Sequence, residues 1–197
     1  MSDTPYTEDN RLPLLMPDAL TPAQKTLHQQ MLGEQIPWAE KAGFQAATPD
    51  GQLLGPFNAL LYGPEVGRAY LDYFSAERKH TSLPERVHEI VILTVGAAWG
   101  AAYELYAHTA VGKSVGLSQS VIDAIIAGQT PEGLSEQEAS ANEFTRQLAE
   151  TRRVDAPTYA RTQAAFGDKG VVDIVMLSGL YLMSSAVLNA FQVPVPE

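Results

Sequence analysis

The chain has 197 residues, of which 45% are hydrophobic and 18% charged, and its 13 basic against 23 acidic residues give a net charge of −10. A chain of this length can bury a sizeable core as one domain, and its acidity argues against nucleic acid or an anionic membrane as a partner. It contains no cysteine, which excludes disulfides, thiol nucleophiles, thiolate metal ligands and dithiol redox chemistry within it. We expect a cytoplasmic protein, because the acidic start MSDTPYTEDN lacks the basic and apolar regions of a signal peptide.

Helix-start and helix-stop signals recur along most of the chain. They include prolines at first helical positions, glycines where helices should end, and capping boxes such as Ser82-x-x-Glu85 and Ser135-x-x-Glu138. No segment shows sustained alternation of apolar and polar residues, so no strand is expected. We therefore predict an all-α fold, a single-domain helical bundle of about eight helices. The predicted helices cover about residues 22–33, 64–79, 85–98, 103–115, 118–128, 135–153, 155–167 and 171–190.

Two segments lack these helix signals. Residues 1–20 hold three prolines and are predicted to form an arm outside the single helical domain, which spans 21–197. Residues 36–56 are rich in proline and glycine and are predicted to form a long irregular connection. Because that connection also contains Trp38 and Phe44, we expect it to be packed and to line a site.

Two apolar stretches raise the question of a membrane. Residues 90–103 carry no charge but are too few to cross a bilayer. Residues 171–188 are numerous enough, yet they include Asp173, Gly179 and three serines. We interpret this second stretch as a buried core or interface helix and predict no membrane association.

Three ionisable residues sit in or beside the uncharged stretch: Glu89, Glu104 and His108. Glu104 and His108 are four residues apart, so they share a helix face and can hydrogen-bond. Antiparallel packing of the preceding helix could bring Glu89 to the same pocket, with Tyr103 and Trp99 as aromatic walls. Two carboxylates in one low-dielectric pocket push one pKa up, so one can stay protonated and act as an acid while a neutral histidine relays the proton.

A purely structural role and a metal site are both compatible with the same residues. Glu104 and His108 could form a buried ion pair that only fixes helix register. They could also bind a metal together with Glu89, but the bundle metal motif is Glu-x-x-His on two helices, and this spacing has one residue too many. We therefore predict no metal and no cofactor, since nucleotide-binding and serine-hydrolase motifs are absent from the sequence as well. The remaining histidines are expected at the surface: His28, His80 and His88.

The segments PERVHEIVIL (84–93), YELYAH (103–108) and GLS (116–118) resemble the carboxymuconolactone decarboxylase family, within the alkylhydroperoxidase D-like superfamily. The likeness covers roughly residues 53–130 and includes GPFN at 55–58. It implies an all-helical subunit that assembles as a homotrimer or hexamer, with sites near the subunit interfaces. The peroxidase branch of the superfamily carries a Cys-x-x-Cys-x-x-x-His motif with an upstream glutamate.

In this chain Ala101 and Glu104 occupy the two cysteine positions of that motif, while Glu89 and His108 match it. The peroxidase reaction is therefore excluded, and the resemblance points to the decarboxylase-like branch. That branch implies decarboxylation of a small carboxylated lactone in aromatic catabolism.

The resemblance and the chemistry together suggest roles for named residues. His108 and Glu104 are the expected proton-transfer pair and Glu89 the group that tunes or relays. The expected substrate contacts are a hydrogen bond from Asn58 to a lactone carbonyl, a cationic contact from Arg86, and walls formed by Trp99 and Tyr103.

Two alternatives remain beside the decarboxylase: another lyase or hydrolase using the same pocket, and a non-redox oligomeric binding or structural protein. An enzyme should have a solvent-reached cavity with Glu104 and His108 on its wall. A structural protein should show them buried, paired and without a cavity.

Overall fold

The computed structural model describes residues 11–196, and this part of the chain is helical without any strand; its one β-bridge joins Ala47 and Leu53. The all-α expectation is thus confirmed. The elements are η1 (Pro17–Ala19), a 3₁₀ turn, and the α-helices α1 (Pro22–Gly33), α2 (Gln35–Ala42), α3 (Pro56–Leu61), α4 (Pro64–His80), α5 (Glu85–Trp99), α6 (Ala102–Ser114), α7 (Gln119–Ile126), α8 (Glu136–Thr151) and α9 (Ala156–Ala190).

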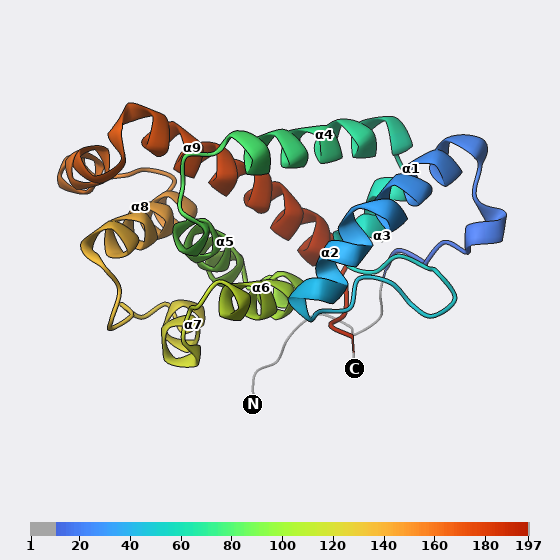
Figure 1. Ribbon diagram of the computed structural model, residues 1–197, viewed down its shortest axis with the longest axis horizontal. Helices are drawn as coiled ribbons and strands as arrows, with labels where there is room; N and C mark the ends of the chain where they lie inside the picture. Colours follow the sequence, from blue (N-terminus) through green and yellow to red (C-terminus); the bar gives the residue numbers. More distant parts are fainter. Residues whose placement is uncertain (1–10, 197) are drawn as a thin grey trace.

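Helix α5 is the centre of the fold, packed against α6, α7, α8 and α9. All ten of its residues from Val87 to Gly96 are buried, which explains why the sequence there is almost free of charge. In Figure 1, α1, α2 and α3 gather at one end of the molecule, α7 and α8 lie towards the other, and α9 crosses it diagonally below α4. The site described below lies where α4, α5, α6 and α9 come together with α2 and α3.

Side chains cap the starts of four helices, and the predicted capping box at Ser135 is among them. Thr21 and Ser135 make full capping boxes, and the side chains of Ser118 and Asp155 accept backbone N–H groups at the starts of α7 and α9. The predicted capping box at Ser82 is wrong. Its hydroxyl donates instead to Oδ2 of Asp173 at 2.6 Å, and α5 begins after Pro84 without a side-chain cap.

The predicted irregular connection at 36–56 is only partly correct. Its first part is helix α2, in which Pro37 occupies the first turn and therefore breaks no intrahelical hydrogen bond. Gly43, at φ 91°, ends that helix in the left-handed conformation. Its last residue, Pro56, begins α3. Pro37 was thus a helix-start signal and Gly43 a helix-stop signal for α2, and the prediction missed them because both were counted as signs of an irregular segment.

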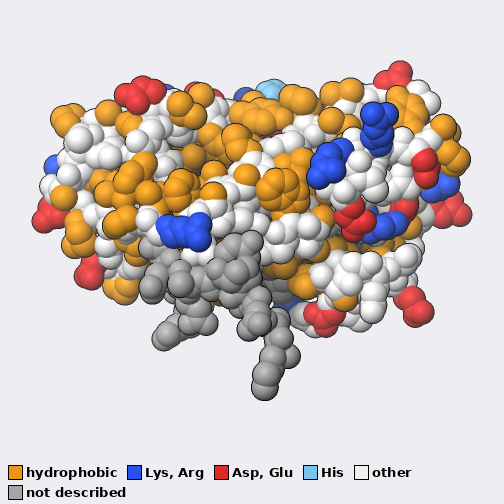
Figure 2. All heavy atoms as spheres, turned by 180° about the vertical axis from the view of Figure 1, so that it is seen from behind, with side chains coloured by type: hydrophobic (Ala, Val, Ile, Leu, Met, Phe, Trp, Pro, Cys, Tyr) orange, Lys and Arg blue, Asp and Glu red, His pale blue; other side chains and the backbone are white. Residues whose placement is uncertain are grey.

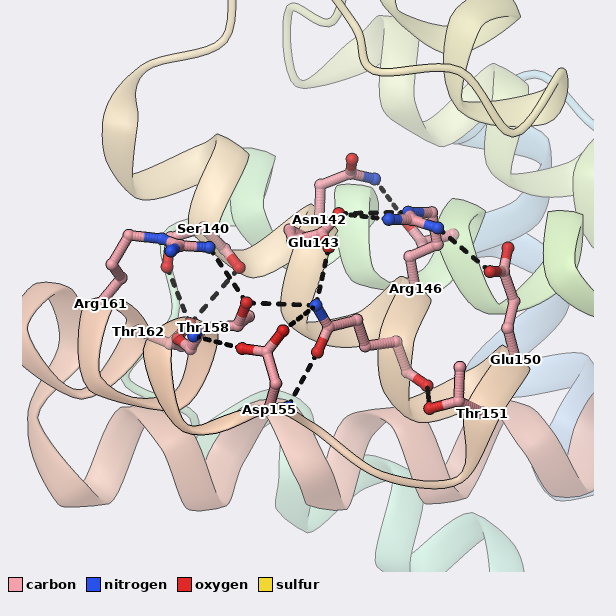
Figure 3. Close-up of polar contacts among 12 residues, drawn as sticks. Ser140, Asn142, Glu143, Arg146, Glu150, Thr151, Asp155, Thr158, Arg161 and Thr162 are labelled. Carbon is pink, nitrogen blue, oxygen red and sulfur yellow. Dashed lines mark hydrogen bonds and ion pairs between the residues drawn. The ribbon is translucent and has the colours of Figure 1, made fainter.

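The two predicted C-terminal helices form α9, which is broken at Gly167 (φ 66°, ψ 177°). Its first part is joined to α8 by a polar network (Figure 3), in which Ser140 and Thr162 hydroxyls lie 2.8 Å apart and Asp155 accepts from the Thr158 N–H at 2.7 Å. Among the described residues this is the one helix long and apolar enough to span a membrane, but half of its most apolar window is buried inside the protein. One side of this helix therefore belongs to the core.

Residues 11–15 lie against the helical body. The backbone N–H of Arg11 donates to the carbonyl of Phe191, the hydroxyl of Tyr62 donates to the carbonyl of Pro13, and Gln52 donates to the carbonyl of Leu14. The rest of the predicted arm, residues 1–10, lies outside the described residues.

Candidate active site

Glu89 on α5 and Glu104 and His108 on α6 come together as a buried triad. Nδ1 of His108 is 2.7 Å from Oε2 of Glu89, and Nε2 of His108 is 3.3 Å from Oε1 of Glu104. The imidazole therefore bridges the two carboxyl groups through its two different nitrogens. None of the three residues is more than 4% exposed, so the pairings operate at low dielectric, where charge interactions are strong.

The turn between α5 and α6 brings these side chains into contact. Gly100 ends α5 at φ 60°, a left-handed conformation that favours glycine. Gly96 lets the two helices approach closely, because a β-carbon there would lie 3.2 Å from Cδ2 of Leu105 and 3.5 Å from Cγ of Glu104. The glycines of the motif thus set the distance across which Glu89 reaches His108.

The two carboxyl groups of the triad have opposite pKa shifts. Burial raises the pKa of Glu89, but the charges and hydrogen bonds of His108 and His88 outweigh it and lower that pKa to about 2. Burial also raises the pKa of Glu104; His108 opposes this rise, the charge of Glu89 adds to it, and the result is about 7. Near neutral pH Glu89 is thus an ionised acceptor, while Glu104 can hold or release a proton. A pair of carboxyl groups with such separated pKa values is the usual basis of acid/base assignments.

Glu104 and His108 lie on the wall of a cavity of about 40 Å³. Aromatic side chains make up much of the remaining wall, including Trp38 of α2, Phe44, Phe74 of α4 and Tyr181 of α9. The ring of Tyr181 stands edge-on to the imidazole of His108, with the centroids 5.0 Å apart. The site is therefore an apolar chamber with one acid/base group pair in its wall. The expectation that the 36–56 segment lines a site through Trp38 and Phe44 matches this geometry.

Tyr103 also lines the cavity, and its hydroxyl donates to the carbonyl of Gln45 at 2.8 Å. Gly55 makes room for it, because a β-carbon at that residue would lie 2.2 Å from Cε1 of Tyr103. Gly55 is also at φ 61°, so both its space and its backbone favour glycine.

Three residues predicted to bind substrate lie outside the cavity. Asn58 is buried, but its amide donates to the carbonyl of Pro13 and accepts from the N–H of Leu15. Arg86 pairs with Glu138 at 2.6 Å and donates to the carbonyl of Gly116. Trp99 is 41% exposed and lines a different hollow. The predicted substrate contacts of these three residues are therefore not found at this cavity. The reason is the same for all three: nearness in sequence or in a matched motif does not determine which way a side chain faces.

Two histidines expected at the surface are buried instead. His88 lies 3.0 Å from Oε2 of Glu77, and its pKa is raised to about 9 because hydrogen bonds and charge from Glu77 and Glu89 outweigh the lowering by burial. His28 is hydrogen-bonded through Nε2 to the carbonyl of Gly51 at 2.8 Å. His80 is exposed, as expected. The sequence signal for His88 was its place two residues before the uncharged stretch that begins at Ile90.

One part of the criterion set by the sequence for an enzyme is met, since a cavity is present with both groups on its wall. The same groups are nevertheless buried and mutually paired, as a structural pair would be. Within residues 11–196 no three histidine, aspartate or glutamate side chains are arranged to hold a metal ion.

Comparison with known proteins gives a family and a fold. Residues 64–147, which include the whole triad, match the model of the Carboxymuconolactone decarboxylase family. A search of curated proteins gives no match.

Three solved structures share the fold. One is an alkylhydroperoxidase AhpD core from Ralstonia eutropha JMP134, an uncharacterized peroxidase-related protein (TM-score 0.76, 19% identity, covering 95% of this chain and 92% of that one). Another is an uncharacterized peroxidase-related protein from Silicibacter sp. TM1040 (TM-score 0.73, 14% identity, 99% and 96%). The third is a variant of the debrominase Bmp8 in complex with 2,3,4-tribromopyrrole (TM-score 0.72, 14% identity, 95% and 92%). The match of residues 64–147 supports the resemblance to the carboxymuconolactone decarboxylase family, and the shared architecture shows that the chain has the alkylhydroperoxidase D-like fold.

Proposed function

We propose that the protein is a cysteine-independent acid/base enzyme that decarboxylates a small carboxylated lactone or a related carbonyl compound. One observation carries the proposal. Glu104, a carboxyl group with a pKa near 7, lies on the wall of an apolar cavity and is linked through His108 to the ionised Glu89.

The proposed reaction uses this arrangement in two steps. The bond between the substrate and its carboxylate breaks, carbon dioxide leaves, and the electron pair is delocalised into the neighbouring carbonyl. Glu104 then donates its proton to carbon, and His108 is placed to return a proton to Glu104. An apolar wall favours the first step, because a carboxylate is poorly solvated there and neutral carbon dioxide is not penalised.

The cavity constrains how substrate enters. A volume of about 40 Å³ holds about three water molecules, so a lactone requires a wall side chain to turn aside. Trp38 and Phe74 are the suitable residues, because they also line a second hollow that lies outside the first.

Arg78 lies in that outer hollow and is our replacement for Arg86 as the cation that meets an anionic substrate. Its guanidinium carbon is 5.5 Å from the centre of the Trp38 ring. It has no ion pair within the described part of the chain, and its charge acts on Tyr181 of the cavity wall. The substrate class that fits both hollows is therefore a small molecule with an apolar part for the cavity and a carboxylate that meets Arg78.

The test is ultraviolet-monitored turnover of γ-carboxymuconolactone by wild type, Glu104→Gln and His108→Ala. We expect turnover by the wild type and a loss of roughly a hundredfold or more in both variants, in line with the contribution of a positioned acid. As pH rises through about 7, kcat should fall, because Glu104 loses the proton that it donates. Glu40→Gln is the matched control, since it makes the same change at an exposed carboxylate of α2.

Circular dichroism and gel filtration of each variant separate loss of chemistry from loss of fold. A folded wild type without turnover of this lactone would reject that substrate. Unchanged turnover in folded Glu104→Gln would reject the assignment of the acid.

We also propose, as the family resemblance implies, that copies of this chain assemble into a homotrimer or hexamer. Figure 2 shows hydrophobic side chains gathered over much of one face. Exposed apolar side chains also follow one another along α9, including Val172, Val175, Met176 and Met183. Light scattering after gel filtration gives the mass directly, and a monomer would contradict this proposal.

A further inference from the structure

Two more buried ionisable residues extend the triad away from the cavity. Nε2 of His88 is 3.0 Å from Oε2 of Glu77, and Nδ1 of His88 is 3.5 Å from Oε1 of Glu89. Carboxyl and imidazole groups therefore alternate from α4 through α5 to α6, joined by hydrogen bonds of 3.0 and 2.7 Å and by ion-pair contacts of 3.5 and 3.3 Å. We name this series the relay chain; in order, its members are Glu77, His88, Glu89, His108 and Glu104.

Each inner member of the relay chain contacts its two neighbours through two different atoms. His88 uses Nε2 and Nδ1, Glu89 uses Oε1 and Oε2, and His108 uses Nδ1 and Nε2. A group that passes a proton must accept it at one atom and release one from another, which imidazole and carboxyl groups can both do. A structural ion pair needs only one such contact per residue.

The two ends of the relay chain lie in different surroundings. Glu104 at the inner end faces the cavity. Glu77 at the outer end belongs to the last turn of α4, where Arg78, Lys79 and His80 are exposed. Oε1 of Glu77 is buried and has no hydrogen-bond partner among the described residues. The outer carboxyl group thus keeps one oxygen free to accept a proton.

The proposed reaction gives such a chain a task. Each turnover consumes the proton of Glu104, which must be replaced before the next. Glu104 and His108 line the cavity that substrate fills, so water in the cavity cannot resupply the proton while substrate is bound. The side chain of Glu77 is 6% exposed and lies outside that cavity.

We propose that Glu77 and His88 resupply the proton of Glu104, so that they support catalysis from a position outside the substrate cavity. This inference rests on the proposed function. A proton taken up at Glu77 passes to Nε2 of His88, and the proton on Nδ1 of His88 passes to Glu89. Glu89 passes a proton to Nδ1 of His108 while the imidazole holds its own proton on Nε2, and this Nε2 proton returns to Glu104. The imidazole is then left with the Nδ1 proton of the resting pair and changes tautomer before the next transfer. One proton enters and one leaves, and no group is oxidised or reduced.

Other ionisable groups near the relay chain do not offer a parallel route. Those that face it from the packed helices are Tyr70, Tyr73 and Arg78 of α4, Tyr103 of α6 and Tyr181 of α9. Burial raises the pKa of each of the four tyrosines above its usual value, so they keep their protons throughout the neutral range. Arginine does not release its proton in proteins.

The experiment compares His88→Gln and Glu77→Gln with the wild type. The control is His80→Gln, which changes an exposed histidine at the end of α4, the helix that carries Glu77. In weak buffer we expect kcat to fall about tenfold or more in the two relay variants, with KM unchanged within about twofold. Added imidazole, a diffusible proton carrier, should restore part of the lost kcat. An unchanged kcat, or a loss that imidazole does not restore, would overturn the proposal, because a merely structural role is not rescued by a buffer.

A second readout needs no substrate. Nitrogen-15 NMR measures how fast the ring N–H of His108 exchanges with water. We expect this exchange to be about tenfold slower in both relay variants and unchanged in His80→Gln; equal rates in all proteins would refute the relay. If the wild type fails to turn over the lactone while exchange still slows, the proposed function falls and the proton path stands. If His88→Gln does not fold, the nearly isosteric Glu77→Gln carries both measurements.

Discussion

Nδ1 of His108 lies 2.7 Å from Oε2 of Glu89, across the α5–α6 contact and out of reach of solvent. Because the pKa of Glu89 is lowered to about 2, its carboxylate accepts this hydrogen bond and His108 donates it. The pair therefore fixes a proton on Nδ1 and directs Nε2 to Glu104. Helix packing and acid/base chemistry depend on the same contact.

Removing Glu89 should destabilise the protein strongly. Breaking a buried charge pair leaves the partner uncompensated, at a cost of about 3–5 kcal/mol, so Glu89→Ala should lower the free energy of unfolding by about that amount. Urea unfolding measures it, with Glu40→Ala on the surface as control. In a double-mutant cycle, Glu89→Ala and His108→Ala together should cost clearly less than the sum of the single changes; additive costs would show that the two side chains do not interact.

Stability should fall as pH rises from about 4.5 to 7. The folded pKa of Glu104 is raised to about 7 from 4.5, so in this range the folded state keeps a proton that the unfolded chain has lost, and ∂ΔG/∂pH is negative. His88, raised from 6.5 to about 9, continues the decline from about 6.5 to 9. Glu89 acts oppositely, since its stabilisation is lost as pH falls from about 4.5 towards 2.

Urea unfolding at a series of pH values tests this dependence. Glu104→Gln should flatten the curve between about 4.5 and 7 and leave the part above 7 in place. A slope in that range that survives the substitution would place the responsible group elsewhere.

Gly55→Ala should destabilise the protein and disturb the cavity wall. The new β-carbon would lie 2.2 Å from the ring of Tyr103, and the backbone there has φ 61°. Overpacking of this kind costs about 1–3 kcal/mol, measurable as a lower melting temperature. Gly33→Ala is the matched control because no atom lies within 4 Å of its added β-carbon. Replacing the aromatic ring with a smaller side chain, in Tyr103→Leu, should recover part of the stability lost in Gly55→Ala. No recovery would mean that the backbone strain at residue 55 dominates the loss.

Arg78 and Arg86 should differ in their effect on substrate binding. Arg78→Gln removes the cation beside Trp38 and should raise KM for a carboxylated substrate several-fold, with less effect on the affinity for its fully esterified, uncharged analogue as a competitive ligand. Arg86→Gln breaks the pair with Glu138 and should leave KM unchanged. Measuring KM of each variant at two salt concentrations distinguishes the two arginines, since a charge contact near solvent weakens with salt. The reverse pattern would restore Arg86 as the binding residue.

The triad could be predicted from sequence because its signal is local. Glu104 and His108 share a helix face by their spacing, and a short turn at Gly100 makes α5 and α6 neighbours, which brings Glu89 close. The helices of the C-terminal half were predictable for the same reason: Ser118, Ser135 and Asp155 cap them within four residues.

The outer half of the relay chain could not be predicted, although Glu77 and His88 are only 11 residues apart. Their contact depends on how the chain turns between the end of α4 and the start of α5, which the spacing of the two residues does not specify. The same limit applies to Asn58 and Arg86, whose motif positions were identified but whose partners, Pro13 and Glu138, come from elsewhere in the chain. The cavity itself joins α2, α4, α6 and α9, and no single segment of the sequence contains its outline.

Asn58 binds the main chain on both sides of Leu14, through the carbonyl of Pro13 and the N–H of Leu15. It sits on α3, the helix that supplies Pro56 and Phe57 to the cavity wall. Residues 13–15 therefore pack against the outer side of α3 and hold in place the helix that forms part of the cavity wall. Their amide hydrogens should be protected from exchange, and cutting the chain at that point would loosen the chamber some distance away.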